Sequence, residues 1–134
     1  MKNLWKFVLM ISVLLYACKN NKPKDAYKYE DRIIHFLSSE KINTTNTCIY
    51  FVKNMGCPCV QTSINDLTHY KNKAEKNYIF SNFDTDSIPE IIDFGFDDFF
   101  IYDNTYYEKF GLNFSTPKIF IFKKNKVVEW QDYQ

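Results

Sequence analysis

The sequence predicts an α/β domain with a mixed central sheet, flanking helices and a C-terminal β-hairpin. Short β-prone apolar runs alternate with segments of helical period, an order typical of parallel strands joined by helices. The last two apolar runs, residues 118–123 and 126–130, flank a short polar turn, which is the pattern of a hairpin. The 134 residues are enough for one small domain.

The first half of the domain should contain one buried strand between two helices. Residues 26–41 carry apolar side chains at helical spacing, which predicts an amphipathic helix. Residues 48–52, "CIYFV", form a continuous apolar run typical of a strand buried on both faces. Residues 58–73 return to helical period, and Pro58 stands in the first turn, where its missing N–H costs nothing.

The second half continues the alternation with shorter elements. Residues 77–83 and 99–102 are β-prone and predict strands. Residues 86–95 begin with helix-capping side chains and end on Gly95, so we expect a short helix there. Residues 104–111 predict a turn or a second short helix ending on a glycine.

Residues 1–17 have the composition of a lipoprotein signal peptide. Lys2 and Lys6 precede an apolar run over residues 7–17. That run is shorter than the roughly 20 residues that span a bilayer and is typical of a secretory signal. It ends in "LYAC", which resembles a bacterial lipobox. We therefore expect Cys18 to be lipidated and the protein to be anchored at the periplasmic face of a bacterial membrane.

Residues 18–25 are polar and predict a tether, so that residues 26–134 form the folded domain. Without the signal peptide the chain has 15 basic and 16 acidic residues. This balance gives no electrostatic footprint for nucleic acid. Cys48, Cys57 and Cys59 would then lie in a compartment where disulfides form.

The segment "MGCPCVQ" places two cysteines at the start of a predicted helix. If Pro58 is the first helical residue, Cys57 is the N-cap, where unsatisfied N–H groups and the helix dipole favour a thiolate. Thiols in such positions have pKa values of about 3.5–7.5, so Cys57 is the candidate nucleophile. Cys59 is close enough to pair with it in a small, labile ring. Cys48 is expected to be a core residue.

The order of strand, cysteine loop, helix and strand, followed by "STP" and a hairpin, resembles the thioredoxin fold over roughly residues 47–130. It is most similar to the membrane-tethered periplasmic thiol-disulfide proteins of the TlpA and ResA type. That resemblance implies that Cys57 and Cys59 are catalytic. It also implies that Thr116-Pro117 is the family's cis-proline site and that Thr116, Pro117 and Pro58 bind substrate. The implied partners are extracytoplasmic protein thiols or disulfides, with no cofactor.

The family motif is Cys-x-x-Cys, whereas this chain has Cys-Pro-Cys, so a one-residue deletion is needed to place Cys57 on the family's nucleophile. A peroxidase of the related peroxiredoxin type would need a threonine at Asn54 and an arginine nearby, and the sole arginine is Arg32. A Cys-x-Cys pair can also bind Cu(I), but nothing in the sequence brings His35 or His69 to it, so no metal is expected. The remaining alternative is a non-catalytic binding module of the same fold.

Overall fold

The structure, a computed structural model, describes residues 27–53, 57–83 and 95–133. The signal peptide and tether predicted for residues 1–25 lie outside this range, as does most of the helix predicted over residues 86–95. In chain order the elements are α2 (Glu30–Ser39), β1 (Asn46–Val52), α3 (Pro58–Lys71), β2 (Lys76–Ser81), β3 (Asp98–Ile101), α5 (Asn104–Lys109), β4 (Lys118–Lys123) and β5 (Lys126–Asp132).

The five strands form one mixed sheet in the order β3-β2-β1-β4-β5. β1 is central and pairs in parallel with β2, which pairs in parallel with β3. On its other side β1 pairs antiparallel with β4, and β4 with β5. The predicted parallel centre and hairpin edge are therefore confirmed. The architecture is a five-stranded α/β sheet compatible with a thioredoxin-like fold.

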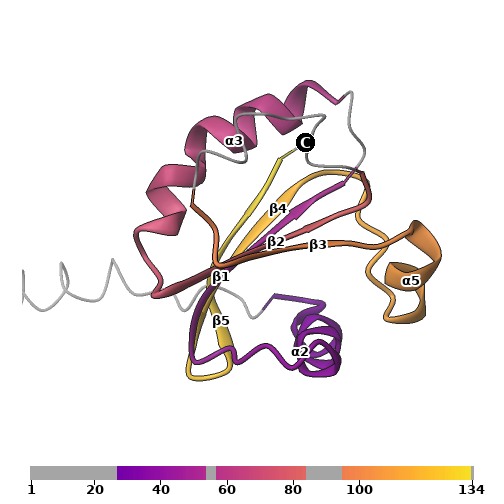
Figure 1. Cartoon of the computed structure of the whole chain (residues 1–134), viewed down its shortest axis with the longest axis horizontal. Coiled ribbons are helices and arrows are strands. Elements are labelled where there is room, and N and C mark those ends of the chain that lie inside the picture. Colours follow the sequence, from indigo (N-terminus) through magenta and orange to yellow (C-terminus); the bar gives the residue numbers. More distant parts are fainter. Residues whose placement is uncertain (1–26, 54–56, 84–94, 134) are drawn as a thin grey trace, which may run out of the picture.

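Helices cover both faces of the sheet, with α3 on one face and α2 and α5 on the other (Figure 1). Side chains alternate between the faces along each strand. In β1, Tyr50 and Val52 therefore pack with α3, whereas Ile49 and Phe51 pack with α2. The sheet thus separates two buried clusters, each closed by its own helix or helices.

The predicted elements within the described residues are all present, with ends that differ by a few residues. α2 begins at Glu30, four residues later than the apolar period suggested, because Tyr27 and Tyr29 instead pack as an aromatic pair before the helix. α5 begins where the Asp103 carboxylate accepts the Tyr106 N–H at 2.8 Å, a standard N-cap. None of the helices in the described ranges has the length and apolar character needed to cross a bilayer.

Candidate functional site

The Cys-Pro-Cys segment forms the first turn of α3, as its sequence predicts. Cys57 is the N-cap, with an extended backbone at φ −73° and ψ 129°, and Pro58 begins the helix. The sulfur atoms of Cys57 and Cys59 are joined as a disulfide, and their Cα atoms lie 5.2 Å apart. That separation falls within the usual range for disulfides. Two cysteines separated by one residue can therefore pair in this turn.

The two cysteines differ in exposure. Cys57 is half-buried and Pro58 is exposed, whereas Cys59 is buried with 7% of its surface accessible. Cys57 is therefore the more accessible residue of the two. The sulfur of Cys59 faces the cluster under α3, with Val60, Ile64 and Leu67 of the same helix. This asymmetry suits one attacking thiol and one thiol that reacts only within the protein.

The helix start favours negative charge on Cys57. The Cys59 N–H donates to the Cys57 sulfur at 3.4 Å, and this contact would strengthen if the sulfur became a thiolate. No acidic residue stands in the first turn of α3, while His69 and Lys71 stand in its last turn. Hence no acidic side chain in that turn offsets the positive end of the helix dipole at Cys57.

Pro117 lies at the same end of the sheet as this turn. It directly precedes β4, whose first residue Lys118 pairs with Phe51 near the end of β1. Pro117 is buried, and its carbonyl accepts the Tyr133 N–H at 3.3 Å. The cis bond implied by the resemblance is wrong, because no peptide bond in the described residues is cis and Thr116–Pro117 is therefore trans. Trans is the form of about 95% of X–Pro bonds in folded proteins.

Thr116 turns its side chain toward the hairpin. Its hydroxyl donates to the Asp132 carboxylate at 2.9 Å, and the Lys118 ammonium lies 2.6 Å from the same carboxylate oxygen. This carboxylate therefore ties the residues on both sides of Pro117 to β5. The Thr116 side chain, predicted to bind substrate, is thus engaged within the protein.

A buried lysine ties the loop before Pro117 to β1. The Lys53 ammonium donates to the Leu112 carbonyl at 3.1 Å and lies 4.8 Å from the centre of the Tyr107 ring. Burial lowers the pKa of Lys53, while the Glu108 carboxylate acts in the opposite direction. Lys53 therefore connects the end of β1, just before the cysteine turn, to the loop that leads into β4.

Tyr133 links the two parts of the candidate site. Its backbone reaches Pro117, while its ring packs in the same cluster as Cys59 and its hydroxyl donates to Asp66 of α3 at 3.2 Å. Burial, together with the neighbouring Asp66 carboxylate, raises the pKa of Tyr133. The end of β5 lies beside the first turn of α3 in Figure 1, consistent with these contacts.

A pair of buried hydroxyls lies in the cluster under α3. The Tyr50 hydroxyl of β1 is hydrogen-bonded to the Ser63 hydroxyl of α3, and Ser63 donates to the Val60 carbonyl at 2.8 Å. Tyr50 and Ser63 are both 0% exposed. Burial raises the pKa of Tyr50, although the bond to Ser63 lowers it in part. Tyr50 is therefore a neutral donor at physiological pH.

The other candidate ligands lie elsewhere. Cys48 is a free, fully buried core residue, as predicted, and burial raises the pKa of its thiol to about 12. His35 and His69 are exposed and stack edge-on against Phe110 and Tyr70 respectively. No group of three metal-ligating side chains occurs among the residues that the structure describes.

Sequence reasoning missed Tyr50, Ser63 and Tyr133. Two simple signals point to the first two. Tyr50 is two residues from Cys48 and Val52 in β1, so it shares their face of the sheet. Ser63 is four residues after Cys59, which is one helical turn along the same buried stripe. Tyr133 follows the hairpin and carries no comparable pattern.

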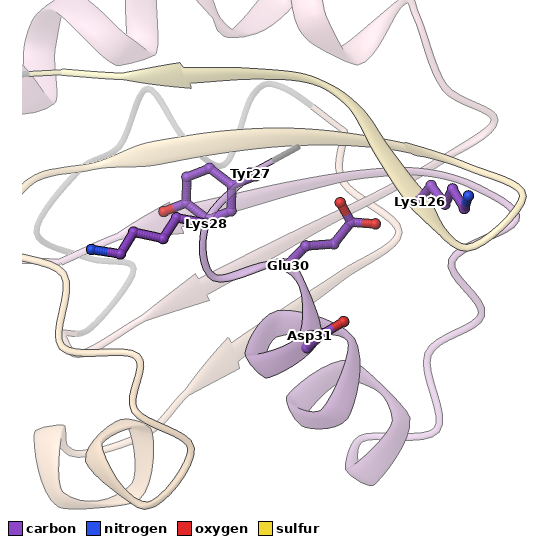
Figure 2. A pocket seen from close by; sticks show the side chains of 5 residues that line it. All are labelled: Tyr27, Lys28, Glu30, Asp31 and Lys126. Carbon is purple, nitrogen blue, oxygen red and sulfur yellow. The ribbon is translucent and has the colours of Figure 1, made fainter. Parts of the chain in front are cut away.

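A separate hollow of about 310 Å³ lies between the start of α2 and the hairpin turn (Figure 2). The charged ends of Lys28 and Lys126 point in opposite directions, and Glu30 and Asp31 do not converge with them. The Glu30 carboxylate instead accepts the Val127 N–H at 3.3 Å. This lining does not form a set of groups aimed at one ligand, so the cysteine turn remains the candidate site.

Comparison with known proteins adds no assignment, since no protein-family model, curated protein or solved structure matches the chain. The candidate site therefore depends on its geometry and on the resemblance described above.

Proposed function

We propose that this protein is a membrane-anchored thiol-disulfide oxidoreductase of thioredoxin-like type, similar to the TlpA and ResA proteins. It would exchange disulfides with extracytoplasmic protein partners. The observation that carries the proposal is the pairing of half-buried Cys57, at the N-cap of α3, with buried Cys59, the second residue of the helix. This arrangement supplies an accessible nucleophile and an internal thiol to resolve its adduct.

In the reductive direction, the Cys57 thiolate attacks one sulfur of a partner disulfide. A Cys57–partner S–S bond forms, the partner's own S–S bond breaks, and its leaving thiolate takes a proton from water. Cys59 loses its proton and attacks the Cys57 sulfur, so that the Cys57–Cys59 bond forms and the second partner thiolate leaves. The protein pair is oxidised by two electrons, and the partner disulfide is reduced to two thiols.

In the oxidative direction the same steps run in reverse. A partner thiolate attacks the Cys57 sulfur of the existing disulfide, and Cys59 leaves as the thiolate and is protonated. The buried position of Cys59 favours attack at Cys57 in this direction, because Cys57 is the more exposed residue of the pair. Exposed Pro58 and half-buried Thr116, which precedes buried Pro117, are the proposed neighbours of the partner backbone. The midpoint of the pair decides the direction in the cell.

The test is a redox titration of the full-length protein in glutathione buffers, read by alkylation of free thiols and mass shift. We expect a reversible two-thiol transition, lost in Cys57→Ser and in Cys59→Ser. Cys59→Ser should trap a covalent complex with the partner, whereas Cys57→Ser should not, because Cys57 is the more exposed residue of the pair. Cys48→Ala is the matched control, since it removes a cysteine outside the turn. Absence of any reversible transition would support the alternative, a non-catalytic binding module.

The anchor is a second part of the proposal. Residues 1–17 would be removed and Cys18 lipidated, which would hold the domain at the periplasmic face of a bacterial membrane. Growth with a radiolabelled fatty acid should label the wild-type protein and not Cys18→Ala. Label that persists in Cys18→Ala, or a wild-type protein without label, would contradict this anchoring.

A further inference from the structure

The hydrogen atoms of the Tyr50–Ser63 pair can be assigned from its contacts. A serine hydroxyl has one hydrogen, and that of Ser63 is donated to the Val60 carbonyl at 2.8 Å. We therefore assign the hydrogen between the two hydroxyls to Tyr50, with the Ser63 oxygen as acceptor. Both hydrogens are thus engaged. What the pair still offers is acceptor capacity on the Tyr50 oxygen, to which no described residue donates when Tyr50 is the donor to Ser63.

The pair lies on the side of the sheet that buries Cys59. Ser63 is one turn after Cys59 on the buried stripe of α3, a spacing that brings Cβ atoms to about 5–6 Å. Tyr50 and Cys59 belong to the same packed cluster, and Tyr50 reaches α3 through Ser63. Most other side chains of this cluster are aliphatic and offer no acceptor.

Reduction of the disulfide gives Cys59 a hydrogen that needs an acceptor. In the disulfide its sulfur has no hydrogen. When a partner dithiol supplies two electrons and becomes a disulfide, Cys57 is released as the thiolate and Cys59 as the thiol, and one proton goes to water. The new S–H of Cys59 is a donor in a buried, mostly apolar place, where an unpaired polar group is unfavourable.

We propose that the Tyr50 oxygen, oriented by Ser63, accepts the hydrogen bond of the reduced Cys59 thiol and so keeps the proton on Cys59. Tyr50 and Ser63 are then positioning residues that stabilise the dithiol state relative to the disulfide. The proposal rests on the proposed function of the cysteine pair. It also gives the two cysteines different protonation states, with a thiolate at the helix start and a neutral thiol inside.

Tyr50 is 0% exposed, whereas the other two tyrosines around Cys59 bond to partners nearer the surface. The Tyr133 hydroxyl is donated to Asp66 at 3.2 Å, and Asp66 itself is exposed. The Tyr70 hydroxyl donates to Gln131 at 3.5 Å. Cys48 has its own thiol buried in the cluster and brings no charge. Cys57 shares the helix start and carries the charge of the reduced pair.

The experiment compares Tyr50→Phe and Ser63→Ala with wild type in the full-length protein. Tyr50→Phe removes the acceptor, so the equilibrium constant for reduction by glutathione should fall about two- to twelvefold, the effect of one neutral hydrogen bond. Ser63→Ala frees the Tyr50 hydrogen to point at the Cys59 sulfur, which favours the thiolate. In both variants the pKa of Cys59, from site-resolved alkylation of the reduced protein against pH, should fall.

Tyr107→Phe is the matched control, because it deletes a buried tyrosine hydroxyl on the opposite face, where Tyr107 donates to the Ser81 carbonyl at 2.7 Å. It should destabilise the fold and leave both redox readings unchanged. If Tyr50→Phe and Ser63→Ala change the constant and the Cys59 pKa no more than Tyr107→Phe does, the proposal is overturned. If either Tyr50→Phe or Ser63→Ala does not fold, the same comparison with Tyr107→Phe is made on the other variant. A wild-type protein without a reversible dithiol would instead contradict the proposed function, and this inference with it.

Discussion

The two faces of the sheet are packed with different side chains. On the face covered by α2 and α5, the Phe36 ring has neighbouring ring centres at 4.9 Å (Phe80) to 6.4 Å (Tyr102). That face is an aromatic cluster centred on Phe36. On the face covered by α3, the cluster is mainly aliphatic and holds the disulfide, the free thiol of Cys48 and the Tyr50–Ser63 pair.

The difference indicates how stability and chemistry are divided in this domain. Aromatic rings bury large areas and gain further energy from edge-to-face contacts, so the α2 face should dominate the free energy of folding. The α3 face holds the sulfur atoms and the hydroxyls that can act on them. Because the sheet lies between the two clusters, a change in one should leave the properties of the other largely intact.

The largest expected effect is the loss of a ring from the aromatic face. Phe36→Ala should lower the free energy of unfolding by about 3–5 kcal/mol, because the Phe36 side chain of α2 is 0% exposed and packs against α5 and the sheet. Urea unfolding measures this loss. The glutathione titration of the folded variant should match wild type.

The control for that experiment is Val128→Ala, which trims a side chain that is 47% exposed on the hairpin and should change stability by less than about 0.5 kcal/mol. A Phe36→Ala protein with wild-type stability would remove the basis of the comparison between the faces. So would a shift in its redox equilibrium as large as that expected for Tyr50→Phe.

The second-largest expected effect is the contribution of the Cys57–Cys59 disulfide to the free energy of unfolding. The bond joins residues only two positions apart, so chain-entropy arguments give it a stabilisation of less than about 2 kcal/mol. Urea unfolding with and without a phosphine reductant should show a difference of that size. The Cys57→Ser, Cys59→Ser double variant should be insensitive to reductant. A difference above about 3 kcal/mol would mean that the pair is a structural staple.

The smallest expected effect concerns Cys48, the free thiol outside the Cys57–Cys59 pair. Burial raises the pKa of Cys48 from 9.0 to about 12, so the unfolded chain loses this proton first. The resulting stabilisation is present below pH 9 and is lost as the pH rises toward 12, with a slope of at most about 1.4 kcal/mol per pH unit.

Cys48→Ala should therefore show a flatter fall in unfolding free energy between pH 9 and 10, with the same slope as wild type between pH 6 and 8. Above pH 10 the buried tyrosines, whose pKa values are also raised by burial, add their own losses in both proteins. Identical slopes for the two proteins between pH 9 and 10 would show that Cys48 is accessible to water in the folded state.

Local sequence patterns were sufficient to predict the strand and the helix start that hold the cysteine turn. The continuous apolar run of β1 and the proline at the start of α3 together place Cys57 at the N-cap, and both features depend only on neighbouring residues. The hydrogen bond from Thr116 to Asp132 joins residues that meet only through the hairpin register. The trans bond before Pro117 is the ordinary form of an X–Pro bond, and the cis expectation came from the family resemblance alone.

Tyr50 illustrates the same limit. Its place in "CIYFV" predicts burial, and its spacing from Val52 predicts which face it shares. Its partner, however, depends on how α3 packs across β1, because an apolar stripe sets the side of a helix that is buried without setting its position along the strand. The bond to Ser63 is therefore a tertiary contact that composition and period do not encode.

The position of β1 at the centre of the sheet has a consequence for the order of events during folding. Ile49 must find Tyr78 on one side and Phe120 on the other, and such distant pairings close long loops and make folding slow. The Cys57–Cys59 loop is minimal by comparison and can close in an unfolded chain. An unfolded chain in an oxidising solution can therefore form this bond before its sheet assembles, and the bond itself joins no residues that are distant in the sequence.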